Sequence, residues 1–136
     1  MKLQGRILLF DKVNLNRDIF SKDCKLTIPE KVPLTWNFDR NRPIGVAEVT
    51  SDDIGLVATA ETFSNDIRDV LTDDKIGAGG YYTGVKKHEE NGVIIIDEAR
   101  LAAVGLVLEP VREEYLLKLV EEKEERKSEI RLGVQK

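Results

Sequence analysis

Residue types that often carry structure or chemistry are scarce in this chain of 136 residues, which has one cysteine, one histidine and one tryptophan. A single cysteine, Cys24, excludes an internal disulfide and a cysteine-rich zinc site, and it fits a thiol packed in a reducing compartment. No apolar run is long enough to span a bilayer, and the first residues lack the apolar core of a signal peptide. We therefore expect a protein that stays in the cytoplasm at synthesis and has no membrane partner.

An excess of basic residues is also missing. The chain has 21 Lys and Arg against 25 Asp and Glu, a net charge of -4. Proteins that wrap nucleic acid usually carry a basic face, so nucleic acid is not an expected partner. Hydrophobic residues make up 41% and charged residues 34% of the chain, which is typical of one soluble globular domain.

Alternating apolar residues predict a strand-rich fold. A turn at 51–55 separates two of the predicted strands and indicates a hairpin. Residues 11–24 are polar and are predicted to form a loop. The glycine-rich segment 76–84 is predicted to be stable only where another backbone or a ligand packs closely against it. The predicted strands, including the two of this hairpin, lie at 4–10, 32–38, 44–50, 56–62 and within 93–108.

Two helices are predicted as well. Ser64 can cap a short helix whose apolar stripe, formed by Ile67, Val70 and Leu71, must face the sheet. Pro110 suits the first turn of a C-terminal helix that packs as far as Val120. We therefore predict an α+β fold with a β-rich domain at 1–120 and a charged helical tail at 121–136.

The candidate bases and nucleophiles of the chain form no catalytic motif. His88 lies among charged residues in a predicted hairpin loop, whereas a general base needs a positioned partner and a sheltered site. Neither the glycines near Ala78 nor the paired aspartates have the spacing of a phosphate or calcium loop, so no cofactor or metal is expected. The serines lie in turns, at a cap or in the tail: Ser21, Ser51, Ser64 and Ser128. The paired aspartates are Asp52, Asp53, Asp73 and Asp74.

Four motifs, in the same order, resemble the tailed-phage prohead maturation proteases over roughly the first four-fifths of the chain. In that family a strand ends in Asn-His-Asp, and a Pro-Ile/Val-Gly segment and an acidic turn with a Gly-Leu strand follow. A Ser-hydrophobic-Gly-Tyr strand then carries the nucleophile, and a later strand resembles Leu-x-Glu-Val-Ser-Leu-Val followed by Pro. The matching segments here are Asn37-Phe38-Asp39 with Pro43-Ile44-Gly45, Asp52-Asp53-Ile54-Gly55-Leu56, Ala78-Gly79-Gly80-Tyr81 and the later strand 101–107.

Two departures from the family pattern decide what the resemblance implies. Phe38 occupies the position of the catalytic histidine and Ala78 that of the serine, and neither side chain can replace the group it stands for. If the alignment holds, positions 38 and 78 lie within reach of each other. The acidic third member of the family's catalytic triad cannot be assigned to one residue, and Glu48 and Glu61 are the alternatives. The resemblance implies an inactive relative with a mainly antiparallel, barrel-like β-sheet, a short helix and a C-terminal helix.

The resemblance predicts a non-catalytic virion or assembly protein of a phage or prophage, which binds capsid or another head component in the host cytoplasm or in the virion. Self-association is a further option. One alternative is an active maturation protease with a misaligned site, using His88 and a serine or Cys24; another is a binding module unrelated to capsids, whose terminal helix recruits a partner. The candidate binding or vestigial site comprises Trp36, Asn37, Phe38, Asp39, Ala78, Gly80 and Tyr81.

Overall fold

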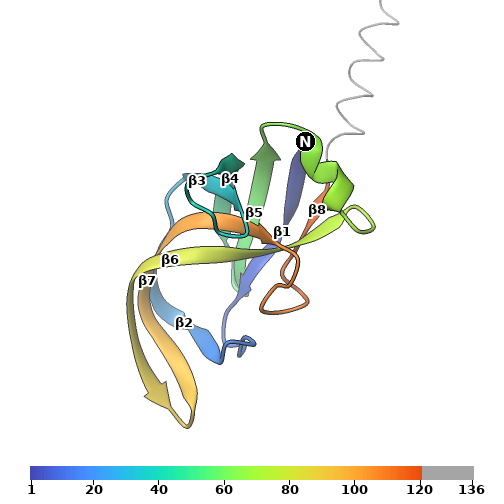
Figure 1. The fold of residues 1–136 in the computed structure, drawn as a ribbon. Coiled ribbons are helices and arrows are strands. Elements are labelled where there is room, and N and C mark those ends of the chain that lie inside the picture. Colours follow the sequence, from blue (N-terminus) through green and yellow to red (C-terminus); the bar gives the residue numbers. More distant parts are fainter. Residues whose placement is uncertain (121–136) are drawn as a thin grey trace, which may run out of the picture.

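A computed structural model describes residues 1–120 as a mainly β structure built around a closed barrel (Figure 1). The predicted helical tail at 121–136 lies outside the described residues. The elements are β1 (Lys2–Leu9), β2 (Asp18–Thr27), β3 (Lys31–Trp36), β4 (Pro43–Ser51), β5 (Gly55–Thr62), the 3-10 helix η1 (Asp66–Val70), β6 (Lys75–Glu90), β7 (Val93–Val107) and β8 (Leu116–Leu119).

Seven strands close the barrel in the order β7-β3-β4-β5-β1-β8-β6, because β6 pairs again with β7. β2 pairs with residues 94–100 of β7, before the part of β7 at 104–106 that pairs with β3, and it stays outside this ring. The β2–β7 and β3–β7 pairs are parallel and the other pairs antiparallel. The predicted barrel-like sheet and the β4–β5 hairpin are therefore confirmed, and the sheet is mixed.

The α+β prediction is wrong for residues 1–120, which contain no α-helix. The predicted short helix is one 3-10 turn whose N-cap residue is Asn65, and the Asn65 side chain makes no capping hydrogen bond. Ser64 precedes the cap position, and its Oγ accepts one long hydrogen bond of 3.4 Å from the Asp66 N–H. Leu71 directly after it is extended, Asp73 and Asp74 then adopt left-handed backbone conformations, and an isolated bridge between Thr72 and Lys75 leads into β6. The turn therefore has no room to grow into an α-helix.

The predicted C-terminal helix is also wrong as far as residue 120. Residues 116–119 form β8, which pairs with both β1 and β6. Without β8, β1 and β6 would each leave unpaired backbone groups in the barrel wall, and these are costly to bury. Leu117 is fully buried between more exposed neighbours, the alternation of a strand. The need to close the barrel therefore outweighs local helix propensity.

The polar segment 11–24 is a loop only in its first part, since β2 begins at Asp18. β2 pairs with β7 through residues 18–20 and 25–27, and the pairing is irregular between these two parts. The polar residues that suggested a loop occupy this irregular part, where pairing is interrupted.

The barrel interior is packed with aliphatic side chains and one buried tyrosine. The Tyr115 hydroxyl accepts a hydrogen bond from the Leu9 backbone N–H at 3.0 Å and donates one to Asn14 Oδ1 at 2.8 Å. These bonds join the loop before β8 to the β1 end of the barrel. Fully buried core residues include Leu3, Leu34, Leu56, Ala58, Ala60, Ala78, Leu101, Val104, Leu106 and Leu117.

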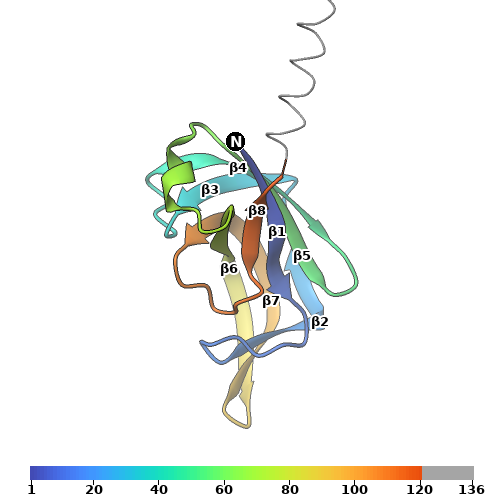
Figure 2. The same cartoon turned by 90° about the vertical axis from the view of Figure 1, so that its right-hand side faces the viewer.

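Beyond the barrel, β6 and β7 continue as a projecting hairpin, with β2 against β7 (Figures 1 and 2). Both views place this hairpin at the end opposite the N-terminus and η1. Its side chains are largely exposed from residue 84 to residue 92. We call residues 84–98 of this hairpin the arm. No helix in the described part of the chain is long and apolar enough to cross a membrane.

Candidate functional site

The turn that follows β3 holds the first part of the candidate site. Asn37 and Phe38 have φ angles of 50° and 61°, a region that costs a non-glycine residue roughly 1–2 kcal/mol. The Asn37 N–H donates to the Leu106 carbonyl at 2.8 Å, and the Asp39 N–H donates to the Trp36 carbonyl at 2.9 Å. These backbone bonds hold the turn against β7.

The ring of Phe38 lies over two paired glycines of the barrel wall. Gly79 on β6 is the register partner of Gly105 on β7. A Cβ atom at Gly105 would lie 2.5 Å from Phe38 Cδ1, and one at Gly79 would lie 3.3 Å from Phe38 Cζ. The close approach predicted for the glycine-rich segment is therefore present, and it is made by an aromatic side chain of the same chain.

Tyr81 extends this aromatic surface. The ring centroids of Tyr81 and Phe38 lie 6.5 Å apart. The guanidinium carbon of Arg40 lies 5.0 Å from the Tyr81 centroid. An arginine over a tyrosine face is a favourable cation–π arrangement. The turn and the outer face of β6 are thus joined through side chains.

Ala78 faces away from this surface. Its side chain is fully buried within the hydrophobic core, and successive residues of a strand point to opposite faces. Gly79 therefore faces Phe38 while Ala78 faces the barrel interior. Gly80 also faces away from Phe38, because a Cβ there would lie 2.5 Å from the Tyr82 hydroxyl. The structure brings four predicted site residues to one surface, Trp36, Asn37, Phe38 and Tyr81. Asp39 lies in the same turn, where its carboxylate accepts a hydrogen bond from the Asn41 N–H at 3.1 Å. Positions 38 and 78 are not brought together.

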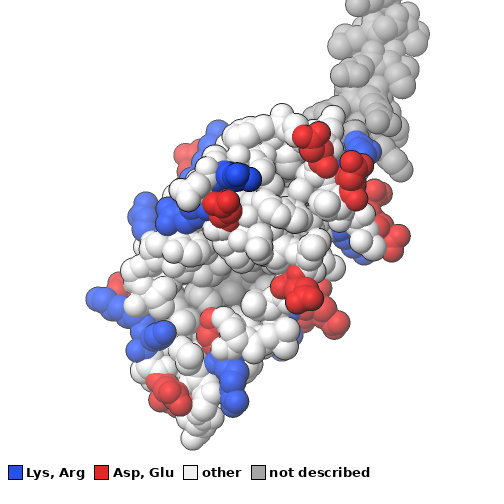
Figure 3. Space-filling view, in the orientation of Figure 1, with Lys and Arg blue, Asp and Glu red and all other residues white. Residues whose placement is uncertain are grey.

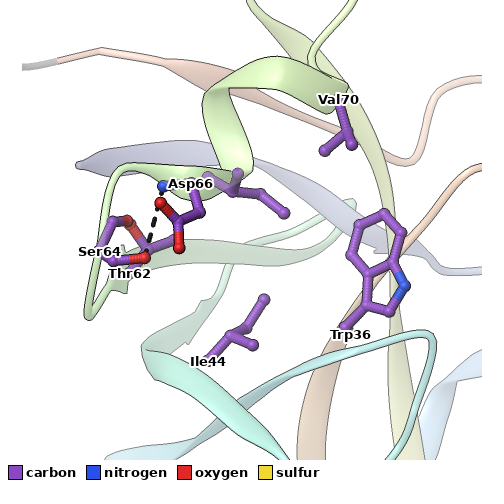
Figure 4. Close-up of a pocket in the computed structure, with 7 residues that line it drawn as sticks. Trp36, Ile44, Thr62, Ser64, Asp66 and Val70 are labelled. Atoms are coloured by element: carbon purple, nitrogen blue, oxygen red, sulfur yellow. Dashed lines mark hydrogen bonds between the residues drawn. The ribbon is translucent and has the colours of Figure 1, made fainter.

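Two hollows flank Trp36. The first, of about 230 Å³, lies between β3 and η1 (Figure 4) and is lined by Trp36, Ile44, Thr62, Ser64, Asp66, Ile67 and Val70. The second, of about 470 Å³, lies between the turn and the end of β7 and is lined by Trp36, Asn37, Phe38, Val107, Leu108 and Glu109.

Leu108 is the most prominent residue that the sequence prediction missed. Its side chain is 70% exposed, and it lines both the second hollow and a third hollow that also contains Val70. Local sequence offered no signal for it, because an apolar residue after a strand is ordinary. We call the surface formed by Trp36, Phe38, Val70, Tyr81 and Leu108 the Trp36 face.

Figure 3 shows a broad uncharged area over β6 and β7, with charged side chains gathered toward its margins. Arg40 and Arg42 are exposed on the turn after β3, and Asp66 and Asp69 are exposed on η1. An apolar area rimmed by charges of both signs is typical of a protein-interaction site.

His88 lies on the arm, nine residues along β6 from Gly79 and thus roughly 30 Å away at the rise of a strand. Its Nδ1 is 2.6 Å from Asp97 Oδ2 and its Nε2 is 3.2 Å from Glu90 Oε1. The hydrogen bonds to Asp97 and then Glu90 raise the pKa of His88 above its ordinary value. Both ring nitrogens are thus held by carboxylates, an arrangement that favours the charged imidazolium.

The alternative nucleophiles and acids are placed elsewhere. The pKa of Cys24 is raised by burial, with Asp97 and Glu98 adding to the shift, which disfavours the reactive thiolate. Glu48 and Glu61 are both exposed and line a shallow hollow outside β4 and β5. Ser128 falls outside the described residues. Within residues 1–120, no group of three or more His, Cys, Asp or Glu residues is placed to hold a metal ion.

Comparisons of the chain with protein-family models, with curated proteins and with solved structures find no match.

Proposed function

We propose that this chain is a non-catalytic protein-binding module of phage or prophage head assembly, which contacts capsid or another head component through the Trp36 face. The order of the four motifs that resemble prohead maturation proteases supports the phage part of the proposal and a fold of the prohead and herpesvirus protease type. The match of positions 38 and 78 to the catalytic pair gives no support, because Ala78 points into the core and away from Phe38. The surface geometry supports the binding part. The predicted location, in the host cytoplasm or in the virion, follows from the same resemblance.

One observation carries the binding part, namely the Phe38 ring seated over Gly79 and Gly105. A phenyl ring cannot transfer a proton, so this position offers packing instead of acid–base chemistry. The ring occupies the space that the two glycines leave open, and with Tyr81 it forms an aromatic surface on the outer face of the barrel wall. The backbone bonds of the turn hold that ring in place before any partner arrives, which lowers the entropy cost of binding.

Exposure of the neighbouring side chains adds a reason for a partner. Leu108 is 70% exposed, while Val70 and Tyr81 are 39% and 37% exposed. Apolar surface removed from water stabilises an association by about 25 cal/mol per Å² before the costs of binding are subtracted. A partner that covers these three side chains and the Phe38 ring would bury a central aromatic cluster, the usual composition of an interaction hot spot.

Co-expression with the capsid protein of the same phage or prophage tests the proposal. We expect the two proteins to co-purify, and Leu108→Asp to weaken the complex at least about tenfold, as expected for a charge placed in an apolar hot spot. Ile54→Asp is the matched control, because Ile54 is 56% exposed but lies in the β4–β5 turn, at the far ends of these strands from Ile44 and Thr62.

Three outcomes would count against the proposal. Capture that Leu108→Asp and Ile54→Asp reduce equally would remove the Trp36 face from the interaction. Failure to capture capsid or any other purified head protein would remove the phage role. Cleavage of the capsid precursor that disappears in His88→Ala would favour an active protease instead.

A further inference from the structure

The hollow between β3 and η1, here called the Trp36 pocket, has the size and lining of a site for one side chain. Its volume of about 230 Å³ is below the range of roughly 300–1,000 Å³ typical of small-molecule sites. Trp36, Ile44 and Ile67 are partly buried against the core, so its walls are supported by the barrel.

One charged group faces this apolar pocket. Asp66 is the only ionisable residue among the seven that line it, and Figure 4 shows its carboxylate and the Trp36 indole on different sides of the pocket. Within residues 1–120, no hydrogen bond or ion pair engages that carboxylate, although the Asp66 backbone N–H donates to Ser64 Oγ at 3.4 Å. The Thr62 hydroxyl is already donated to the Ser64 carbonyl at 2.6 Å. Asp66 thus remains as an acceptor for an incoming donor.

We propose that the Trp36 pocket receives an arginine side chain of the partner protein, an inference that rests on the proposed binding function. An arginine stem can lie along the walls formed by Ile44 and Ile67. Its planar guanidinium stacks favourably on an aromatic face such as the indole and donates two parallel hydrogen bonds to a carboxylate.

Other side chains match this lining less well. A leucine would fill the walls but would remove water from the Asp66 carboxylate without offering a donor. A glutamate would be repelled by the same carboxylate. A lysine would pair with it but presents a compact, strongly hydrated charge that stacks less well on an indole. Charge and shape together therefore favour arginine.

Because Trp36 is the only tryptophan of the chain, its fluorescence reports on the pocket directly. The probe is a tripeptide with arginine between two alanines, blocked at both ends. The comparison peptide carries citrulline, which keeps the shape of arginine without its charge. We expect saturable fluorescence changes and a dissociation constant about tenfold lower for the arginine peptide, the effect of one charge-assisted contact worth about 1.4 kcal/mol.

Two variants on the same 3-10 helix sharpen the test. Asp66→Asn should remove the preference for arginine over citrulline, whereas Asp69→Asn should preserve it, because Asp69 is also exposed but does not line the pocket. Unchanged midpoints of urea unfolding would show that both variants keep the fold.

Equal binding of the two peptides by the unaltered protein, absence of a saturable change, or an intact preference in Asp66→Asn would each overturn the inference. Its failure is separable from that of the proposed function. Capsid capture sensitive to Leu108→Asp, combined with no preference for the arginine peptide, would leave the proposed function intact and reject the pocket alone. A preference for the arginine peptide without any capsid capture would retain the pocket and reject the phage role.

Discussion

The same two strands build two regions of opposite character. In the barrel wall, β6 and β7 pair through Gly77–Tyr81 and Ala103–Val107, and Ala78, Val104 and Leu106 are fully buried. In the arm, the same strands carry cross-strand ion pairs. Lys86 Nζ lies 3.1 Å from Glu98 Oε2, and His88 is bound to Asp97 at 2.6 Å.

This contrast teaches which force holds each region. In the wall, burial of apolar side chains and close approach over glycines dominate. In the arm, exposed ion pairs contribute little to the free energy of unfolding, typically 0–1 kcal/mol each. The arm therefore depends on backbone pairing with β2 and within the hairpin, and on the burial of Ile96 at its base. The Trp36 face lies at the barrel end of these strands, where Phe38 packs on Gly79 and Gly105 and Trp36 packs against the core.

Truncation of one core residue should have the largest effect. Leu106→Ala removes a fully buried side chain of β7 and is expected to lower the free energy of unfolding by about 2–5 kcal/mol. Ile95→Ala makes a comparable truncation on the same strand within the arm, where the side chain is only partly buried, and should cost less than about 1 kcal/mol. Urea unfolding of both variants measures the difference, and equal losses would contradict this division.

A smaller effect is expected where Phe38 meets the wall. The Cβ of Gly105→Ala would lie 2.5 Å from the Phe38 ring, so overpacking should cost about 1–3 kcal/mol. In the Phe38→Ala variant the obstructing ring is absent, so Gly105→Ala can be introduced there without the clash. A double-mutant cycle by urea unfolding should therefore show that the cost of Gly105→Ala falls sharply, and an unchanged cost would show that the ring does not cause it.

The smallest effect on stability is expected in the arm, where it depends on pH through His88. The pKa of His88 is raised above its ordinary 6.5 by Asp97 and Glu90. The protonated imidazole is thus favoured more in the folded than in the unfolded chain. Its stabilising contribution should be fully present below pH 6.5 and be lost as the pH rises through the folded-state pKa.

NMR titration of the imidazole measures this pKa directly. Asp97→Asn should lower the pKa of His88, and Cys24→Ser should leave it nearly unchanged as a control on the neighbouring strand. A pKa of His88 at or below the ordinary value in the unaltered protein would show that the carboxylate contacts are not populated in solution.

Local patterns predicted most of the barrel strands because alternation is a property of neighbouring residues. The predicted strands at 4–10, 32–38, 44–50 and 56–62 correspond closely to β1, β3, β4 and β5. The apolar residues near Tyr115 fit the spacing of a helix and also the alternation of a strand. Their pattern therefore did not discriminate between a helix and β8. β2 was missed because its polar residues resemble a loop.

The candidate site was predictable only in part. The turn residues Trp36, Asn37, Phe38 and Asp39 follow one another in the chain, so a single motif identified them. Leu108 and Asp66 were missed because they approach Trp36 from the end of β7 and from η1. Nothing in the spacing of these residues along the chain indicates that they line hollows beside the same indole.

By itself, the sequence determined where β1, β3, β4 and β5 lie and which of their faces are apolar. It also determined that Phe38 and Ala78 bring no base or nucleophile. The tertiary structure alone decided that Phe38 covers Gly79 and Gly105, that Ala78 points into the core, and that residues 116–119 form a strand. The physical reason is that alternation depends only on adjacent residues, whereas contact across a barrel depends on the register with which distant strands close it.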